Sequence, residues 1–211
     1  MEDDKGMKSF LSPSKGEKFQ SVLIFGAPGS GKGTQGKFLS SAGNHFHLSS
    51  GDIFRGLSPE SPAGELYHSY AGKGELVPDD VTIEIWHHYV QGLIATNRYF
   101  PKDQLLLLDG IPRTVRQAEI LDRYIEVKKI LLLESKSPES LIQRLKRRGM
   151  IEKRQDDKDE EVLRRRMEIY QAETLPVLDY YSKEKVACFQ ADQKPLEVLR
   201  DILISFSNIL S

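Results

Sequence analysis

The chain has 211 residues, of which 30 are basic and 31 acidic. This length suits one domain with small inserts. The balanced charge argues against a nucleic-acid partner, because nucleic-acid-binding proteins usually have an excess of basic residues. A single cysteine excludes an internal disulfide framework and a cysteine-based metal site. No apolar run reaches the ~18–20 residues of a membrane span, and the N-terminus lacks the apolar segment of a signal peptide, so we expect a cytoplasmic protein without membrane contacts.

The first hydrophobic segment of the chain leads directly into a glycine-rich loop. Residues 1–18 are charged, show no hydrophobic period and are expected to form a disordered tail. Four apolar residues at 22–25 then predict a buried parallel strand, and a helix is expected over about 32–42. Glycines between the two let backbone N–H groups approach an anion closely, and the helix N-terminus attracts negative charge. The loop is therefore a candidate phosphate-binding site.

Lys32 is the candidate cation of this loop. It supplies a mobile point charge for the outer phosphates of a nucleotide. A lysine is unfavourable at a helix N-terminus without an anion, which argues against a merely exposed surface residue. The usual phosphate-loop pattern has Ser or Thr directly after the lysine, whereas here Gly33 intervenes before Thr34.

The next elements are a short strand, an irregular region and a long helix. Residues 45–48 predict the strand, and the polar cluster at 49–52 opens another helix. Residues 56–78 are rich in Gly and Pro and are expected to form a small mobile insert. The long helix begins at Asp79 or Asp80 and ends near Thr96. Four residues at four-residue spacing are expected on its buried side: Val81, Ile85, Tyr89 and Leu93.

The second half of the chain alternates strands with helices. Helices are expected over 114–125, 138–149, 159–182 and from 195 onward, and a polar loop over 150–158. Strands are expected near 22–25, 45–48, 105–108, 130–133 and 186–189. This alternation predicts an α/β fold with a five-stranded parallel sheet covered by helices on both faces. Cys188 lies in an apolar run and is interpreted as a buried, inert thiol.

Asp109 follows the apolar strand at 105–108. A carboxylate at the carboxyl end of a buried strand lies at the sheet edge where ligands bind in open α/β folds. Beside a phosphate loop it matches a magnesium-side aspartate. Because Gly33 replaces the hydroxyl ligand, we expect Asp109 to hold Mg²⁺ through water, since Mg²⁺ keeps several waters readily. The alternative is an aspartate that simply ends a strand.

Arginines in the last third of the chain are candidates for neutralising a transferring phosphoryl group. Arg144 and Arg148 are four residues apart on one expected helix and share a face. Arg164, Arg165 and Arg166 are consecutive, so at most two can point in one direction. The alternative is a solvated basic helix face. Elsewhere, Thr114-x-x-Gln117 forms a capping box, and spacing alone favours that structural role for Gln117.

Several of these motifs occur together in the order and spacing found in adenylate kinases. They lie at residues 26–35, 49–55, 74–79, 109–114, 117 and 154–157. The chain resembles the adenylate kinase family from about residue 20 to 205, and the Gly-Lys-Gly-Thr and Asp-Gly-x-Pro-Arg-Thr motifs are highly specific in combination. The resemblance implies a P-loop NTPase fold and reversible phosphoryl transfer from Mg-ATP to AMP, giving two ADP. It also implies a monomer.

The resemblance assigns two nucleotide sites. ATP is expected on Gly29, Ser30, Gly31, Lys32, Gly33, Thr34, Arg144, Arg148 and Lys194. AMP is expected on Ser50, Arg55, Glu75, Leu76, Val77, Gly110, Ile111, Pro112, Arg113, Gln117, Arg154, Arg165 and Arg166. The expected catalytic residues are Lys32, Arg113, Arg148, Arg154 and Arg166. Ser50 stands where the family usually has Thr, and Gln117 would read the adenine edge. The resemblance favours Arg166 over Arg165 through Arg166-Met167-x-x-Tyr170, although counting from Arg154 favours Arg165.

The resemblance also divides the single kinase domain, residues 19–211, into three parts. The core is 19–48, 79–147 and 159–211, the AMP-binding insert is 49–78, and the lid is 148–158. The lid is short and holds neither Cys nor His, so no zinc is expected. Asp156 and Asp157 would contact the ATP-side arginines and close the lid, or serve as N-terminal carboxylates of the next helix. A UMP/CMP kinase and a non-catalytic nucleotide sensor are the alternatives.

Overall fold

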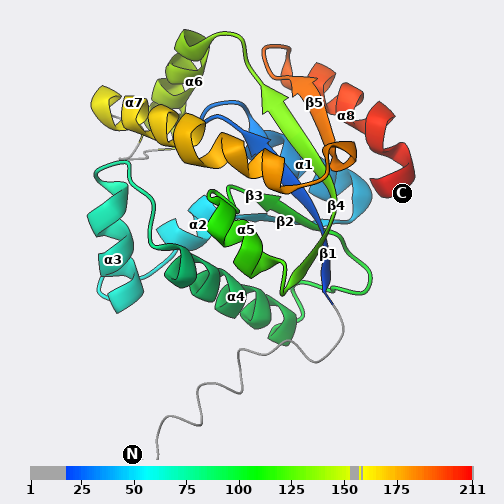
Figure 1. Ribbon diagram of the computed structural model, residues 1–211, viewed down its shortest axis with the longest axis horizontal. Coiled ribbons are helices and arrows are strands. Elements are labelled where there is room, and N and C mark those ends of the chain that lie inside the picture. The colour runs from blue at the N-terminus through cyan, green and yellow to red at the C-terminus, as the bar shows by residue number, and fades with distance from the viewer. Residues whose placement is uncertain (1–17, 153–156, 158, 211) are drawn as a thin grey trace, which may run out of the picture.

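The computed structural model describes residues 18–152, 157 and 159–210 of the chain (Figure 1). Of the tail expected at 1–18, only Lys18 lies within the described residues. Arg154 and Asp156, expected to act in the lid, lie outside them. No helix in this part of the chain is long and apolar enough to cross a membrane.

A parallel sheet of five strands forms the centre of the protein, as the alternation of strands and helices predicted. The strands are β1 (Phe19–Gly26), β2 (Phe46–Ser49), β3 (Leu106–Asp109), β4 (Ile125–Glu134) and β5 (Val186–Gln190). Their order in the sheet is β2-β3-β1-β4-β5, and every pair is parallel. The central strand β3 and residues 21–26 of β1 are buried, which agrees with the apolar runs at 22–25 and 105–108.

Helices cover both faces of the sheet (Figure 1). They are α1 (Lys32–Gly43), α2 (Ser50–Arg55), α3 (Pro62–Ala71), α4 (Asp79–Ala95), α5 (Val115–Leu121), α6 (Pro138–Ile151), α7 (Glu160–Ile169), the π-helix η2 (Tyr170–Thr174), the 3₁₀ turns η3 (Leu175–Tyr180) and η4 (Lys183–Lys185), and α8 (Pro195–Leu210). One core cluster joins α4, α5 and η3 through residues such as Trp86, Leu121 and Val177. The other joins α1 and α8 through Leu39, Val198 and Ile202.

Three strands end side by side at the carboxyl edge of the sheet. The register pairs Ile24 of β1 with Asp109 of β3, and Asp109 with Ser49 of β2. The glycine-rich loop leaves β1 at this edge, the insert leaves β2, and the loop at 110–113 leaves β3. The topology therefore brings segments far apart in the sequence to the place where open α/β sheets bind ligands.

The buried face of α4 differs from the prediction. Leu93 is buried, but Val81 and Ile85 are only half-buried and Tyr89 is exposed. The core side is formed by Ile83, Trp86, Val90 and Leu93. Their spacing of three and four residues follows the 3.6-residue turn, whereas a strict four-residue spacing drifts by about 40° per step around the helix.

The helix expected over 159–182 is interrupted. It is an α-helix only to Ile169 and then continues as η2 and η3. Pro176 has no backbone N–H and cannot complete a regular α-helical ladder at this point, which accounts for the change in winding.

The prediction of a buried Cys188 is wrong, because the thiol is exposed. Cys188 lies on β5, an edge strand of the sheet, and an apolar run does not distinguish an edge strand from a central one. Partial burial and the neighbouring Glu134 carboxylate raise the pKa of the Cys188 thiol. The thiol is therefore protonated and weakly nucleophilic at neutral pH.

Candidate active site

A cavity of about 570 Å³ opens at the carboxyl edge of the sheet. The glycine-rich loop, the start of α1 and the end of β3 form its floor. The insert lies on one side through Arg55 and Leu76, and α6 and α7 lie on the other through Arg144, Arg148 and Arg166. The cavity therefore joins one phosphate-binding loop to two groups of cationic side chains.

The loop between β1 and α1 requires glycine for steric reasons. Gly29 has φ of 85°, and a Cβ there would lie 2.6 Å from the backbone oxygen of Leu141. Gly31, with φ of 96°, precedes α1 without a side-chain cap. Backbone N–H groups at this helix end are thus turned toward the cavity without a competing side chain, as anion binding requires.

Lys32 is partly buried beneath the loop. Its Nζ donates hydrogen bonds to the carbonyl oxygens of Gly26 at 2.7 Å and Ala27 at 3.1 Å. Burial is the main reason that the pKa of Lys32 is lowered to about 8. Asp109 acts in the opposite direction, and the Arg113, Arg148 and Arg166 guanidiniums act in the same direction as burial. Among the described residues, the cavity lining carries eight Lys and Arg side chains against three Asp and Glu side chains, so a polyanion would be stabilised there.

This pKa predicts a pH-dependent affinity for ATP. A pKa of about 8 means that the protonated fraction of Lys32, and with it ATP affinity, falls about tenfold from pH 7 to pH 9. Phosphates favour the ammonium, so binding at pH 8.5 should take up protons. Titration calorimetry in two buffers of different ionisation enthalpy measures both effects. In Lys32→Arg the guanidinium stays protonated, so this part of the pH dependence should disappear; equal pH slopes for both proteins would contradict the prediction.

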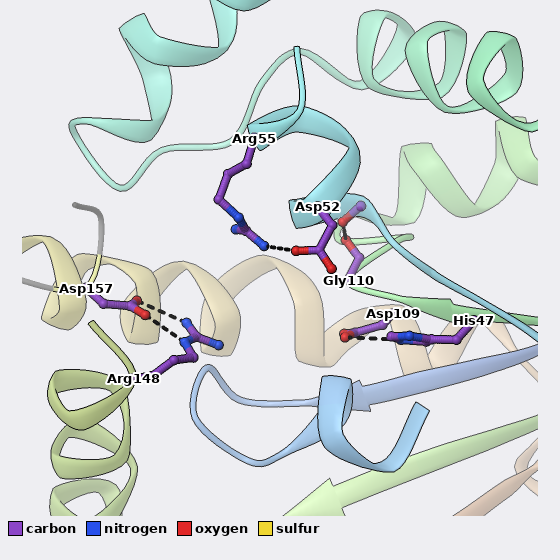
Figure 2. Close-up of polar contacts among 8 residues, drawn as sticks. His47, Asp52, Arg55, Asp109, Gly110, Arg148 and Asp157 are labelled. Atoms are coloured by element: carbon purple, nitrogen blue, oxygen red, sulfur yellow. Dashed lines mark hydrogen bonds and ion pairs between the residues drawn. The ribbon is translucent and has the colours of Figure 1, made fainter. Parts of the chain in front are cut away.

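Asp109 is buried at the end of β3 beside His47 of β2 (Figure 2). Asp109 Oδ2 lies 3.7 Å from His47 Nε2. Burial raises the pKa of Asp109, but His47, Lys32 and Arg113 outweigh it and hold the pKa below its usual value, so the carboxylate is ionised. Two glycines of α1 leave room for this pair: a Cβ at Gly33 would lie 3.4 Å from Asp109 Oδ2, and one at Gly36 would lie 2.3 Å from the His47 ring.

Asp157 joins two of the cavity's arginines. Arg148 donates to it from Nε at 2.7 Å and from Nη2 at 3.0 Å (Figure 2). Arg166 donates to it from Nη1 at 2.7 Å. Asp157 has no exposed surface. Burial raises its pKa, but the two guanidiniums outweigh it and lower the pKa. The lid residue and the helices α6 and α7 are thus joined by charge-assisted hydrogen bonds.

The structure distinguishes the consecutive arginines. The Arg166 side chain is 21 % exposed and lines the cavity. The Arg165 side chain is 53 % exposed, pairs with Glu168 at 3.3 Å and lies outside the cavity. Arg164 pairs with Glu160 on the surface of the same helix.

The insert side of the cavity is built around α2. Arg55 pairs with Asp52 one turn earlier in the helix (Figure 2). Ser50 is buried and its Oγ donates to the Gly110 carbonyl oxygen at 2.7 Å. Arg113 Nε donates to the same oxygen, also at 2.7 Å. The loop after β3 is therefore tied to the start of the insert.

Gln117 is engaged in the structural role that its spacing indicates. Its backbone N–H donates to Thr114 Oγ1, its Oε1 accepts from the Arg113 N–H at 2.8 Å, and its Nε2 donates to Asp79 Oδ1 at 2.9 Å. The Gln117 side chain is almost fully buried. A role in reading adenine stays a prediction.

The cavity lining includes many but not all of the expected site residues. It contains Gly29, Ser30, Gly31, Lys32, Gly33, Thr34, Arg55, Leu76, Asp109, Gly110, Pro112, Arg113, Arg144, Arg148 and Arg166. Ser50, Glu75, Val77, Ile111, Gln117, Arg165 and Lys194 do not line it. Ile111 packs in the core, and Glu75 and Lys194 are exposed.

Sequence reasoning missed three residues that support the site: His47, Asp79 as a hydrogen-bond acceptor, and Thr174. Thr174 Oγ1 donates to the Arg113 carbonyl oxygen at 2.9 Å across 61 positions of the chain. The only sequence signal for His47 is the small Gly36, whose significance depends on knowing that β2 lies against α1.

Comparison with known proteins gives the family. The family model described as adenylate kinase matches residues 24–186, which include the glycine-rich loop, the insert, Asp109 and the arginine-bearing helices. The chain belongs to the adenylate kinase family. An adenylate kinase from Flavobacterium psychrophilum is 40 % identical over 170 residues, which cover 78 % of this chain and 85 % of that protein. Adenylate kinase isoenzyme 1 from Rattus norvegicus is 35 % identical over 171 residues, covering 81 % and 84 %.

The matched range of the family model includes Lys32, Gly33 and Asp109. Among the described residues no three His, Cys, Asp or Glu side chains are grouped as a metal site.

Proposed function

We propose that the protein catalyses reversible transfer of the terminal phosphoryl group of Mg-ATP to AMP, giving two ADP. Membership of the adenylate kinase family supports this reaction. The observation that carries the proposal is the shape of one continuous cavity, with the phosphate loop and Lys32 on one side and Arg55 and Leu76 of the insert on the other. Such a cavity suits two nucleotides that meet through their phosphates.

Each charged residue of the cavity has a proposed role. The loop at 29–34 and Lys32 hold the ATP phosphates, together with Arg144. Arg55 and Arg113 hold the AMP phosphate, and Arg148 and Arg166 neutralise the transferring group. The AMP phosphate is already an anionic acceptor, so the protein needs no nucleophile or general base. Positioning and electrostatic stabilisation then carry the rate of an in-line transfer.

Magnesium would enter with ATP and would be held near Asp109 through water. The ionised, buried Asp109 carboxylate fits this role, and Gly33 offers no hydroxyl as a direct ligand. One carboxylate plus substrate phosphates is a common arrangement for Mg²⁺, which keeps several of its waters. When bound, the ion neutralises charge on the phosphates.

The insert at 49–78 and the lid at 148–158 would close over the nucleotides and exclude water, the competing acceptor. A monomer is also part of the proposal, as the family resemblance implies. A cytoplasmic location is part of the same proposal, and a single cysteine suits a reducing compartment. Light scattering after gel filtration tests the monomer.

A coupled assay with ATP and each of AMP, CMP, UMP and GMP tests the reaction. We expect rapid ADP formation with AMP, and much slower turnover with the other three monophosphates. Preference for UMP or CMP would assign the protein to the pyrimidine nucleotide kinases instead. ATP binding without turnover of any monophosphate would indicate a nucleotide sensor.

A further inference from the structure

Thr174 ends the π-helix η2, where the long helix after the lid changes its winding. In a helix, a threonine hydroxyl ordinarily bonds back to a carbonyl three or four residues earlier. Thr174 Oγ1 instead donates to the Arg113 carbonyl oxygen at 2.9 Å, in the loop between β3 and α5. The π-turn thus directs this hydroxyl away from its own helix toward a loop of the cavity, and π-turns often occur at functional sites.

Arg113 is held at both ends of its backbone by side chains. Gln117 Oε1 accepts from its N–H at 2.8 Å, and Thr174 donates to its carbonyl oxygen. Its Nε is fixed by the Gly110 carbonyl oxygen at 2.7 Å. With these three contacts in place, the outer end of the Arg113 guanidinium is directed into the cavity. If any one of these contacts were lost, the Arg113 backbone or side chain would be less constrained, and the guanidinium could move.

The segments that Thr174 joins carry like charges. Arg166 lies in α7, which continues directly into η2, and it lines the same cavity as Arg113. Burial, followed by the charge of Arg166, lowers the pKa of Arg113, as expected for two cations that line one cavity. The hydrogen bond from the Thr174 side chain to the Arg113 carbonyl oxygen ties the segment that follows Arg166 to the loop that carries Arg113.

We propose that Thr174 is a positioning residue that fixes the register of the α7–η2 segment against the Arg113 loop, so that Arg113 and Arg166 converge on the transferring phosphoryl group. This inference rests on the proposed phosphoryl transfer to AMP. Thr174 also lines the cavity, and the double-mutant cycle with Arg113 separates the positioning role from a direct contact with a nucleotide. The effect of Thr174 passes through the Arg113 peptide group. It should therefore change the rate of phosphoryl transfer and not the affinity for the substrates.

The primary test replaces Thr174 with valine, which keeps the shape of the side chain and removes only the donor. We expect kcat to fall about three- to tenfold, the range of one neutral hydrogen bond, while KM for ATP stays within twofold. Thr174→Ser restores the hydroxyl and should recover most of kcat. Thr96→Val is the matched control, because Thr96 Oγ1 donates to the Gly92 carbonyl oxygen at 2.7 Å at the far end of α4.

Thermal unfolding separates positioning from simple stability. Thr174→Val and Thr96→Val should have unfolding midpoints within a few degrees of each other. If Thr174→Val loses stability but each folded molecule keeps the unaltered kcat, or if Thr174→Ser is as slow as Thr174→Val, the proposal is overturned.

A double-mutant cycle tests the route through Arg113. In an Arg113→Lys background, Thr174→Val should slow kcat less than twofold, because the guanidinium that it positions is gone. An undiminished effect would overturn the proposal. An assay of the unaltered protein tests the proposed reaction separately. If it forms no ADP from ATP and AMP, the proposed function fails, and this inference fails with it. If it forms ADP and Thr174→Val matches it, only the role of Thr174 fails.

Discussion

Lys32→Met should lower kcat by about 10²–10³ or more, the loss measured when a single preorganised charge-stabilising donor is removed. Methionine has a similar length and a good helix propensity, so α1 should form as before. Lys32 is still mostly protonated at pH 7, but its lowered pKa means that folding the charged side chain into this site costs free energy relative to the unfolded chain. Removing the charge offsets the loss of the hydrogen bonds to the loop carbonyls, and the unfolding midpoint should change little.

The measurement is steady-state ADP formation from ATP and AMP, with far-UV circular dichroism to confirm folding. Lys102→Met provides a control for removal of a lysine, since Lys102 is exposed and precedes β3 at the opposite edge of the sheet from the cavity. It should keep the unaltered rate. A folded Lys32→Met protein that is nearly as active as the unaltered one would rule out the role given to the phosphate loop.

Arg166→Ala should lower kcat by about 10³–10⁵, the usual effect of an arginine that stabilises phosphoryl transfer, which is roughly 4–7 kcal/mol of transition-state stabilisation. The residue lines the cavity and shares Asp157 with Arg148. A surface ion pair is worth only about 0–1 kcal/mol. The adjacent Arg165→Ala, which removes only an exposed pair with Glu168, should therefore change kcat less than twofold.

The two variants change the same residue type in the same helix and have the same net charge. The difference between their kcat values therefore reports the direction in which each arginine side chain points. Stopped-flow or coupled assays at saturating ATP and AMP give kcat for both. Similar losses in the two variants, or a larger loss for Arg165→Ala, would contradict the placement of Arg166 at the transferring group.

The parts of the structure predicted well are those whose signal is local. Four of the five strands were recognised from short apolar runs, and the Thr114 cap from its spacing to Gln117. The glycine-rich loop and the aspartate after β3 were found because each is a short motif directly following a strand. Their convergence followed from the rule that parallel strands end at one edge.

What could not be predicted depends on neighbours that are distant in sequence. Three consecutive arginines point about 100° apart around a helix, and only the structure shows which direction faces the cavity. The register of α4 against the sheet, the exposure of Cys188 on an edge strand, and the contact of Thr174 with Arg113 are likewise set by elements far along the chain. No periodicity within one helix carries that information.

The Arg148–Asp157–Arg166 cluster has a consequence for turnover. Its buried carboxylate acts as an internal counter-ion, so the two guanidiniums are kept together without an external anion. At the proposed site, incoming phosphates would share these two cations with Asp157. After the products leave, Asp157 would still neutralise part of the guanidinium charge. This arrangement would lower the affinity of the site for bound phosphates. It also means that product release would not leave two uncompensated cations behind, so release of the products would be favoured.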